Sequence, residues 1–136
     1  MPDSAGADAS GNRKADRRDT TPEFYEITEK KSRFIAYASK ITFVDEANAF
    51  IDEISREHKK ARHIVYAYVL PGIEKYSDAG EPRGTAGQPL LNAIKRRELC
   101  GVVVVVVRYF GGVLLGKGGL LRAYGKAAGK VLDTYI

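Results

Sequence analysis

GVVVVVVRYFGGVLLGKGG, residues 101–119, joins six consecutive valines to an arginine, two aromatic residues and a glycine-rich segment. An unbroken run of β-branched residues predicts a strand that is buried on both faces and therefore lies centrally in a sheet. The glycines permit backbone conformations that other residues avoid, and a helical pattern begins at Leu120. The segment therefore predicts a strand, a glycine loop and a helix N-terminus, an order that favours anion binding.

The rest of the chain alternates short strand patterns with amphipathic helix patterns. Residues 24–28 and 33–41 predict a hairpin, and residues 64–70 and 73–76 predict two further strands. Helices are predicted at about 42–58, after Pro89, and at about 119–134. The order predicts an α+β two-layer sandwich in which helices cover one face of a mixed β-sheet. Because the valines need cover on both faces, the second face is expected to meet a partner or the glycine-rich segments.

Composition divides the 136 residues into two parts. Residues 1–22 hold almost no large apolar side chain and predict a disordered tail, whereas residues 23–136 predict a single domain. The one cysteine, Cys100, excludes an intramolecular disulfide and is expected to be a buried thiol. With only His58 and His63 as histidines, no metal site is expected. No signal peptide is expected, and the valine run is shorter than the roughly 20 apolar residues of a membrane helix, so a cytoplasmic protein without membrane contact is predicted.

Charge is distributed unevenly. The net charge is +5, and residues 83–136 carry nine basic residues against two acidic ones. Arg122, Lys126 and Lys130 stand four apart, which predicts one cationic stripe on the last helix. This stripe favours a polyanionic partner, either nucleic acid or a phosphorylated ligand. A merely solvated basic surface is the alternative.

The glycine loop nearly matches a nucleotide-binding motif. Residues 111–118, GGVLLGKG, follow the P-loop pattern except that Gly118 replaces the hydroxyl residue that would hold magnesium. Nucleotide hydrolysis is therefore not expected. Two interpretations stay open: a phosphate-contacting loop that uses Lys117 and Arg122, or glycines that only let the loop pack.

Two aromatic residues follow the valine strand beside an arginine. Tyr109 and Phe110 with Arg108 suit single-stranded RNA, because rings stack on bases while guanidinium groups meet phosphates. The alternative places the aromatic rings in the core, with Arg108 paired to Asp78 or Glu81.

Residues 76–89, YSDAGEPRGTAGQP, form a long polar segment inside a compact domain. Such loops are more often functional than incidental. Asp78 and Glu81 with Arg83 and Thr85 have the composition of an acid/base site. No nucleophile–base pair accompanies them, so catalysis is a weak interpretation.

These two long motifs, in this order, resemble the IMPACT family, whose bacterial members are YigZ-type proteins. The likeness covers the chain from about Phe24 to its end. It implies a fold like the second domain of small-subunit ribosomal protein five and the fourth domain of elongation factor G. Eukaryotic relatives regulate translation by competing for an activator of the starvation-responsive initiation-factor kinase, and RNA or ribosome binding is expected of the bacterial ones. The resemblance implies no catalytic residue and no cofactor, and it leaves a role open at the motif positions Asp78, Glu81, Arg83, Gly84, Thr85 and Gly87.

The combined prediction is a cytoplasmic, non-enzymatic regulator of translation, linked to the stress response, that binds RNA or a ribosome-associated partner through a basic, glycine-rich surface. The residues expected to contact nucleic acid or phosphate are Arg108, Tyr109, Phe110, Gly111, Gly112, Lys117, Arg122, Lys126 and Lys130. The alternative is a small enzyme that binds a phosphorylated metabolite or a nucleotide between residues 76–89 and 108–119. A module that binds only proteins is a third possibility.

Overall fold

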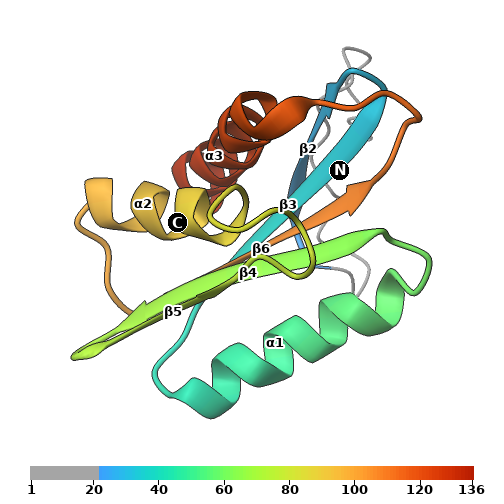
Figure 1. Ribbon diagram of the computed structural model, residues 1–136. Coiled ribbons are helices and arrows are strands. Elements are labelled where there is room, and N and C mark those ends of the chain that lie inside the picture. Colours follow the sequence, from blue (N-terminus) through green and yellow to red (C-terminus); the bar gives the residue numbers. More distant parts are fainter. Residues whose placement is uncertain (1–21) are drawn as a thin grey trace.

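The computed structural model describes residues 22–136, and the predicted tail therefore lies, apart from Pro22, outside the described residues. Figure 1 shows the eight elements. In chain order they are β2 (Phe24–Glu29), β3 (Ser32–Lys40), α1 (Val44–Glu57), β4 (His63–Leu70), β5 (Ile73–Ser77), α2 (Gly87–Arg96), β6 (Val102–Tyr109) and α3 (Gly116–Tyr135). Every element that the sequence predicts is present, with small shifts of its ends, and the α+β class is confirmed.

The valine strand β6 is central in a five-stranded sheet of order β2-β3-β6-β4-β5. All pairings in the described residues are antiparallel, so the expectation of a mixed sheet is wrong. The reason is topological. The connection through α1 makes β3 and β4 run in the same direction but leaves a gap between them, and β6 fills that gap in the opposite direction.

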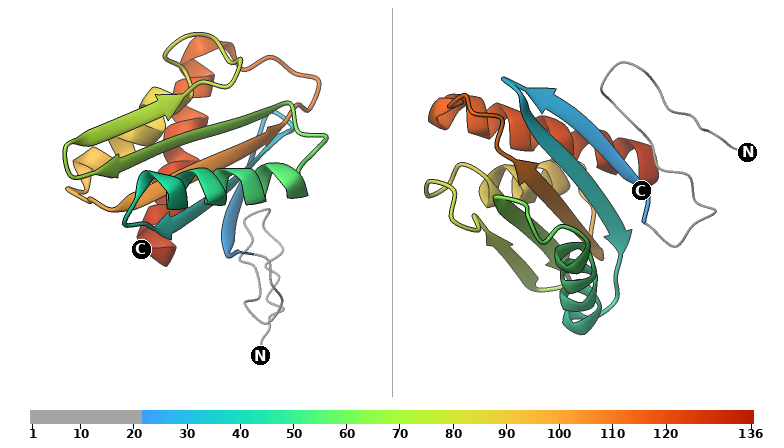
Figure 2. Two further views of the ribbon diagram at one scale, coloured as in Figure 1. Left: turned by 90° about the horizontal axis from the view of Figure 1, so that it is seen from below. Right: turned by 90° about the vertical axis from the view of Figure 1, so that its right-hand side faces the viewer.

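Helices cover both faces of the sheet, which corrects the expectation that they cover one. Figure 2 shows the sheet between α1 on one side and the pair α2 and α3 on the other. Val102, Val104 and Val106 pack in the cluster that contains α2 and α3, whereas alternate valines pack with α1. The second face therefore obtains its cover from α1, because the chain must cross that face to pass from β3 to β4.

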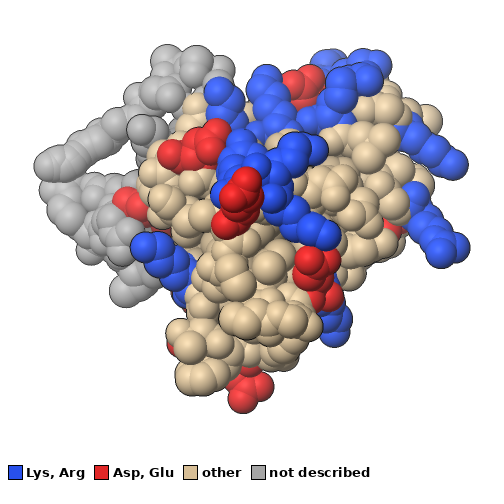
Figure 3. All heavy atoms as spheres, turned by 90° about the vertical axis from the view of Figure 1, so that its left-hand side faces the viewer, with Lys and Arg blue, Asp and Glu red and all other residues tan. Residues whose placement is uncertain are grey.

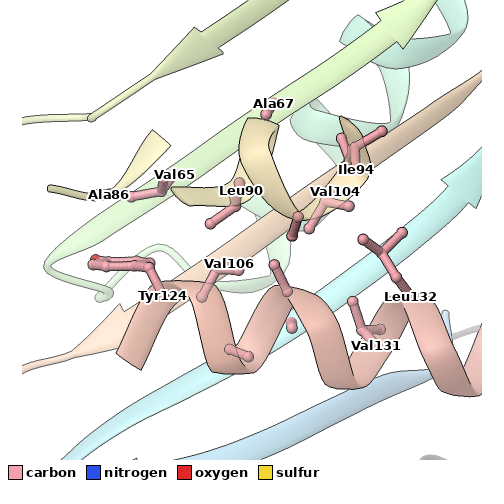
Figure 4. Close-up of a cluster of buried hydrophobic side chains, with 14 of the residues drawn as sticks. Val65, Ala67, Ala86, Leu90, Ile94, Val104, Val106, Tyr124, Val131 and Leu132 are labelled. Atoms are coloured by element: carbon pink, nitrogen blue, oxygen red, sulfur yellow. The ribbon is translucent and has the colours of Figure 1, made fainter. Parts of the chain in front are cut away.

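The larger core cluster joins α2 and α3 to the sheet. Figure 4 shows Ile94 of α2 at the end of the cluster where Val131 and Leu132 of α3 lie, and Leu90 nearer to Tyr124, whose ring is directed towards the start of α2. The inward side of α3 is apolar and buried, and its outward side is left to basic residues.

One further expectation is wrong. Cys100 is exposed rather than buried, because it lies in the turn before β6 and not in the strand. In residues 22–136 no helix is both long enough and apolar enough to cross a membrane.

Candidate functional site

The two sequence motifs meet at one end of the sheet. The strand register places Arg33 opposite Tyr109, and Arg108 opposite both Phe34 and His63. The β2–β3 turn, the segment before α2 and the β6–α3 loop therefore lie at the same end. This end is where most of the predicted site residues gather.

Glu81 is the centre of a buried polar cluster at this end. Its Oε2 accepts hydrogen bonds from Arg108 Nη1 at 2.7 Å and from the Tyr124 hydroxyl at 2.5 Å. Its Oε1 lies 3.5 Å from His63 Nε2, while His63 Nδ1 bonds the Ala79 carbonyl at 2.7 Å. Burial and then Glu81 raise the pKa of Tyr124, so the hydroxyl stays protonated and donates. The pairing of Arg108 with Glu81, one of the two partners considered from sequence, is confirmed.

Arg108 is 5% exposed and its guanidinium group is occupied by the protein itself. Its Nε and Nη2 lie 3.4 and 3.3 Å from the Ser32 hydroxyl, which also accepts from Gly111 N at 3.2 Å. Its guanidinium carbon lies 5.6 Å from the ring centres of both Phe34 and Phe110. Arg108 therefore connects β3, β6 and the β6–α3 loop.

Asp78 holds the beginning of α2. Its Oδ1 accepts from Ala86 N at 3.1 Å and Gly87 N at 2.8 Å, and its Oδ2 accepts from Gly84 N at 2.9 Å. A helix N-terminus presents unpaired N–H groups and partial positive charge, and a carboxylate satisfies both. Asp78 is thus a capping residue supplied from outside the helix.

The other positions of the motif also serve local structure. Thr85 is buried and its hydroxyl donates to the Pro82 carbonyl at 2.5 Å. A Cβ on Gly87 would lie 2.7 Å from a backbone oxygen at the end of β5, so only glycine permits that approach. Gly84 has a φ of +79°, and Arg83 is exposed. Apart from Arg83, the motif residues support the fold.

The two rings after the valines point in different directions. The Tyr109 hydroxyl bonds His58 Nδ1 at 2.6 Å on the α1 side of the sheet, and Arg33 lies 5.2 Å from its ring centre. Phe110 is 37% exposed, and the Arg62 guanidinium carbon lies 4.8 Å from its ring centre. Tyr109 and Phe110 therefore do not form one stacking platform.

The glycines of the β6–α3 loop allow a tight contact. A Cβ on Gly111 would lie 2.0 Å from the Lys31 carbonyl oxygen, which no side chain can occupy. Gly112, next to it, is exposed and has a φ of +88°. Gly111 therefore lets the loop pack against the β2–β3 turn, whereas Gly112 supplies a left-handed backbone conformation in open space.

The outer face of α3 carries exposed cations. Arg122, Lys126 and Lys130 are all exposed, and Lys126 Nζ lies 3.6 Å from Glu29 Oε2. Arg122 and Lys130 form no ion pair within residues 22–136. A hollow of about 240 Å³ separates Arg122 and Lys126 from Lys30 in the β2–β3 turn. Figure 3 shows many Lys and Arg side chains on the α2 and α3 side of the molecule, with Asp and Glu side chains among them.

A basic residue beside this face behaves differently. Arg97 Nε and Nη2 bond the two carboxylate oxygens of Asp133 at 2.8 and 3.1 Å. This hydrogen-bonded pair lowers the pKa of Asp133 and raises that of Arg97. Arg97 is therefore neutralised by a bidentate pair, whereas Lys130 acts on Asp133 only through its charge and Lys126 has a single 3.6 Å contact to Glu29.

The predicted binding residues fall into two groups, except for Tyr109, which lies on the α1 side of the sheet. Arg108, Phe110 and Lys117 line a cleft between the two loops, and Gly111 and Gly112 lie in the same β6–α3 loop. Arg122, Lys126 and Lys130 belong to the outer face of α3. Among residues 22–136, no group of three His, Cys, Asp or Glu side chains is placed to hold a metal ion.

The fold and these two surfaces define an α+β domain in which motif residues hold the loops in place and the cations of α3 lie on the surface. The Impact N-terminal domain family model matches residues 30–132. Over 112 residues the chain is 46% identical to the IMPACT family member YvyE of Bacillus subtilis, covering 80% of this chain and 52% of that protein. It is 42% identical over 108 residues to YigZ of Escherichia coli, covering 76% and 53%. The chain belongs to the IMPACT family, and the resemblance seen in the sequence is confirmed.

Solved structures share the fold. A crystal structure of a hypothetical protein superimposes with a TM-score of 0.80 at 38% identity, over 85% of this chain and 58% of the other. The two-domain translational regulator Yih1 superimposes with a TM-score of 0.51 at 24% identity, over 92% and 48%. The chain spans about half the length of the two curated relatives.

Proposed function

We propose that this domain is a non-enzymatic regulator of translation that binds RNA, or a ribosome-associated partner, through the outer face of α3. One observation carries the proposal. Arg122 and Lys130 are exposed without an ion pair in residues 22–136, and between them Lys126 has only a long contact to Glu29. Family membership and the likeness to a translational regulator support the link to translation. A cytoplasmic location and a role in stress follow as parts of the same proposal.

The spacing of the three cations suits an extended polyanion. Four residues of helix advance about 6 Å, so Arg122, Lys126 and Lys130 follow one line along α3. A single strand of RNA laid along this line places several phosphates near cations at once, and each contact releases counterions. RNA is therefore favoured as the partner.

The test is binding of a fluorescent single-stranded RNA to the full chain at low and at physiological salt. Arg122→Glu with Lys126→Glu is expected to weaken binding about tenfold or more. The matched control is Lys59→Glu with Lys60→Glu, which makes the same charge change in the exposed turn after α1. The proposed surface would be contradicted if both double variants weakened RNA binding equally, or if neither weakened it.

The alternative of a small enzyme has one observation in its favour, the cleft between the two loops. The two carboxylates expected of an acid/base site are engaged in the fold, since Glu81 accepts from Arg108 and Tyr124 and Asp78 caps α2. We therefore favour binding over catalysis. A thermal-shift panel of nucleotides and sugar phosphates separates the two ideas, because a ligand at a hundred times its Kd stabilises by about 2.7 kcal/mol.

A further inference from the structure

The cleft between the loops has apolar walls. It has a volume of about 300 Å³ and is lined by Phe110, Leu114, Leu115 and Leu120 with Pro82 on the facing loop. Leu114 is 81% exposed and Phe110 37%, although both are large apolar side chains. Exposed apolar residues that gather around a depression indicate a place where another molecule binds.

The polar floor of the cleft is already neutral. Glu81 and Arg108 are paired at 2.7 Å and almost fully buried, and Tyr124 donates to the same carboxylate. A ligand group that reaches this floor finds no uncompensated charge. The centre of the cleft therefore suits an apolar group.

The rim of the cleft is cationic. Arg62 and Lys117 both line the cleft and are exposed, and neither forms an ion pair within the described part of the chain. Among the residues that line the cleft, Glu81 is the one carboxylate, and it is buried. An apolar centre between exposed cations is complementary to an apolar group flanked by acidic ones.

The walls favour a peptide over a nucleic acid. The guanidinium carbons of Arg62 and Arg108 lie 4.8 and 5.6 Å from the Phe110 ring centre, where they compete with a stacked base. The other wall residues named above are aliphatic or proline, and they offer no hydrogen bonds to base edges. The volume is at the lower end for small-molecule pockets, which suits one or two side chains.

We infer that this cleft, a surface separate from the outer face of α3, is a docking site for an acidic peptide segment of a partner protein. The segment inserts an aliphatic side chain between Leu114 and Phe110, and its carboxylates meet Arg62 and Lys117. Such an anchor in an apolar pocket, with charges around it, is the usual form of a binding hot spot. The domain then has one surface for RNA and one for protein.

The test is an NMR titration of the isotope-labelled full chain with three synthetic peptides. The first is acidic with two central leucines, the second replaces the leucines by serine, and the third replaces the acidic residues by lysine. The first peptide is expected to shift the amides of Arg62 and residues 110–117, and the other two are not. Leu114→Ser and Lys117→Glu, both at exposed positions, are each expected to weaken the first peptide about fivefold or more.

The matched control is Arg122→Glu with Lys126→Glu, which is expected to lose RNA and keep the peptide. Failure of this surface is thus distinguishable from failure of the RNA surface. The inference is overturned if residues 110–117 do not respond, or if the serine peptide binds as well as the leucine one. It is also overturned if the same amides shift when single-stranded RNA is added, or when naphthyl phosphate, a small aromatic phosphate, is added without the peptide.

Discussion

The buried cluster around Glu81 and the outer face of α3 are both rich in charge, but they use it in opposite ways. In the cluster, Glu81 and Arg108 satisfy each other at 2.7 Å with almost no exposure to water. On α3, Arg122 and Lys130 stand in solvent without an ion pair in residues 22–136. The two loop motifs therefore stabilise the fold, and the helical pattern of α3 carries the exposed charge that we propose meets a partner.

The difference has a physical cause. A buried charge without a partner is costly, so any ion in the core must be paired. An exposed charge is well solvated, and pairing it changes stability little. Substitutions in the cluster are therefore expected to lower the free energy of unfolding, and substitutions on α3 are expected to change binding alone.

The largest effect on stability is expected from Glu81→Ala. This change leaves Arg108 buried without its carboxylate, and we expect a loss of about 3–5 kcal/mol in the free energy of unfolding. Urea unfolding followed by circular dichroism measures it. The control is the double change Glu81→Leu with Arg108→Met, which removes both charges. If the double variant is less stable than Glu81→Ala, the ion pair is not the source of the effect.

A smaller loss is expected from Asp78→Ala. Two backbone N–H groups at the start of α2 and one in the loop before it lose their acceptor, and a lost cap costs up to about 2 kcal/mol. Asp52→Ala, on the exposed side of α1, is the matched control and is expected to stay within about 0.5 kcal/mol. Equal unfolding midpoints in urea for the two variants would show that Asp78 is not a structural cap.

The smallest effect on stability is expected from lowering the pH. His58 Nε2 bonds the Tyr37 hydroxyl at 2.7 Å and its Nδ1 bonds Tyr109, while Arg33 and Glu26 act on it from further away. Burial, and then Arg33, lower the pKa of His58 below its ordinary 6.5, and Glu26 opposes this. Between 6.5 and the lowered value the unfolded chain binds a proton that the folded chain does not, so stability falls as pH falls through that window.

Thermal unfolding between pH 8 and pH 5 measures this dependence. His58→Gln removes the titrating group, so the thermal unfolding midpoint of this variant is expected to fall less than that of the unchanged chain between pH 8 and pH 5. The difference between the two curves isolates His58 from His63, which both chains retain. Parallel curves would contradict the assignment to His58.

Local patterns in the sequence predicted the elements well, because each depends on neighbouring residues. The valines identified the central strand, and the spacing of Arg122, Lys126 and Lys130 identified an exposed helix face. The prediction that helices cover only one face of the sheet was wrong. The path of α1 depends on where β6 inserts between β3 and β4, and no local pattern encodes that position. This insertion places α1 over the second face.

The candidate site was predicted only in part, because its contacts join residues that are far apart in the sequence. Opposite charges in the two motifs made Asp78 and Glu81 the two possible partners of Arg108 in one of the alternatives, and the structure shows that Glu81 is the partner. Nothing in the sequence connects the hydroxyl of Tyr124 to Glu81, although the two are hydrogen-bonded in the structure. Ser32, which accepts from Arg108 and Gly111, carried no recognisable pattern.

The most direct test of the account is the salt dependence of RNA affinity for the unchanged chain and for Arg122→Glu with Lys126→Glu. Each phosphate contact on a single strand contributes about 0.7 to the slope of log K against log salt concentration, so losing two contacts should reduce its magnitude by about 1.4. We predict this reduction together with an unchanged free energy of unfolding. An unchanged slope would show that the outer face of α3 does not meet the RNA and would contradict the account.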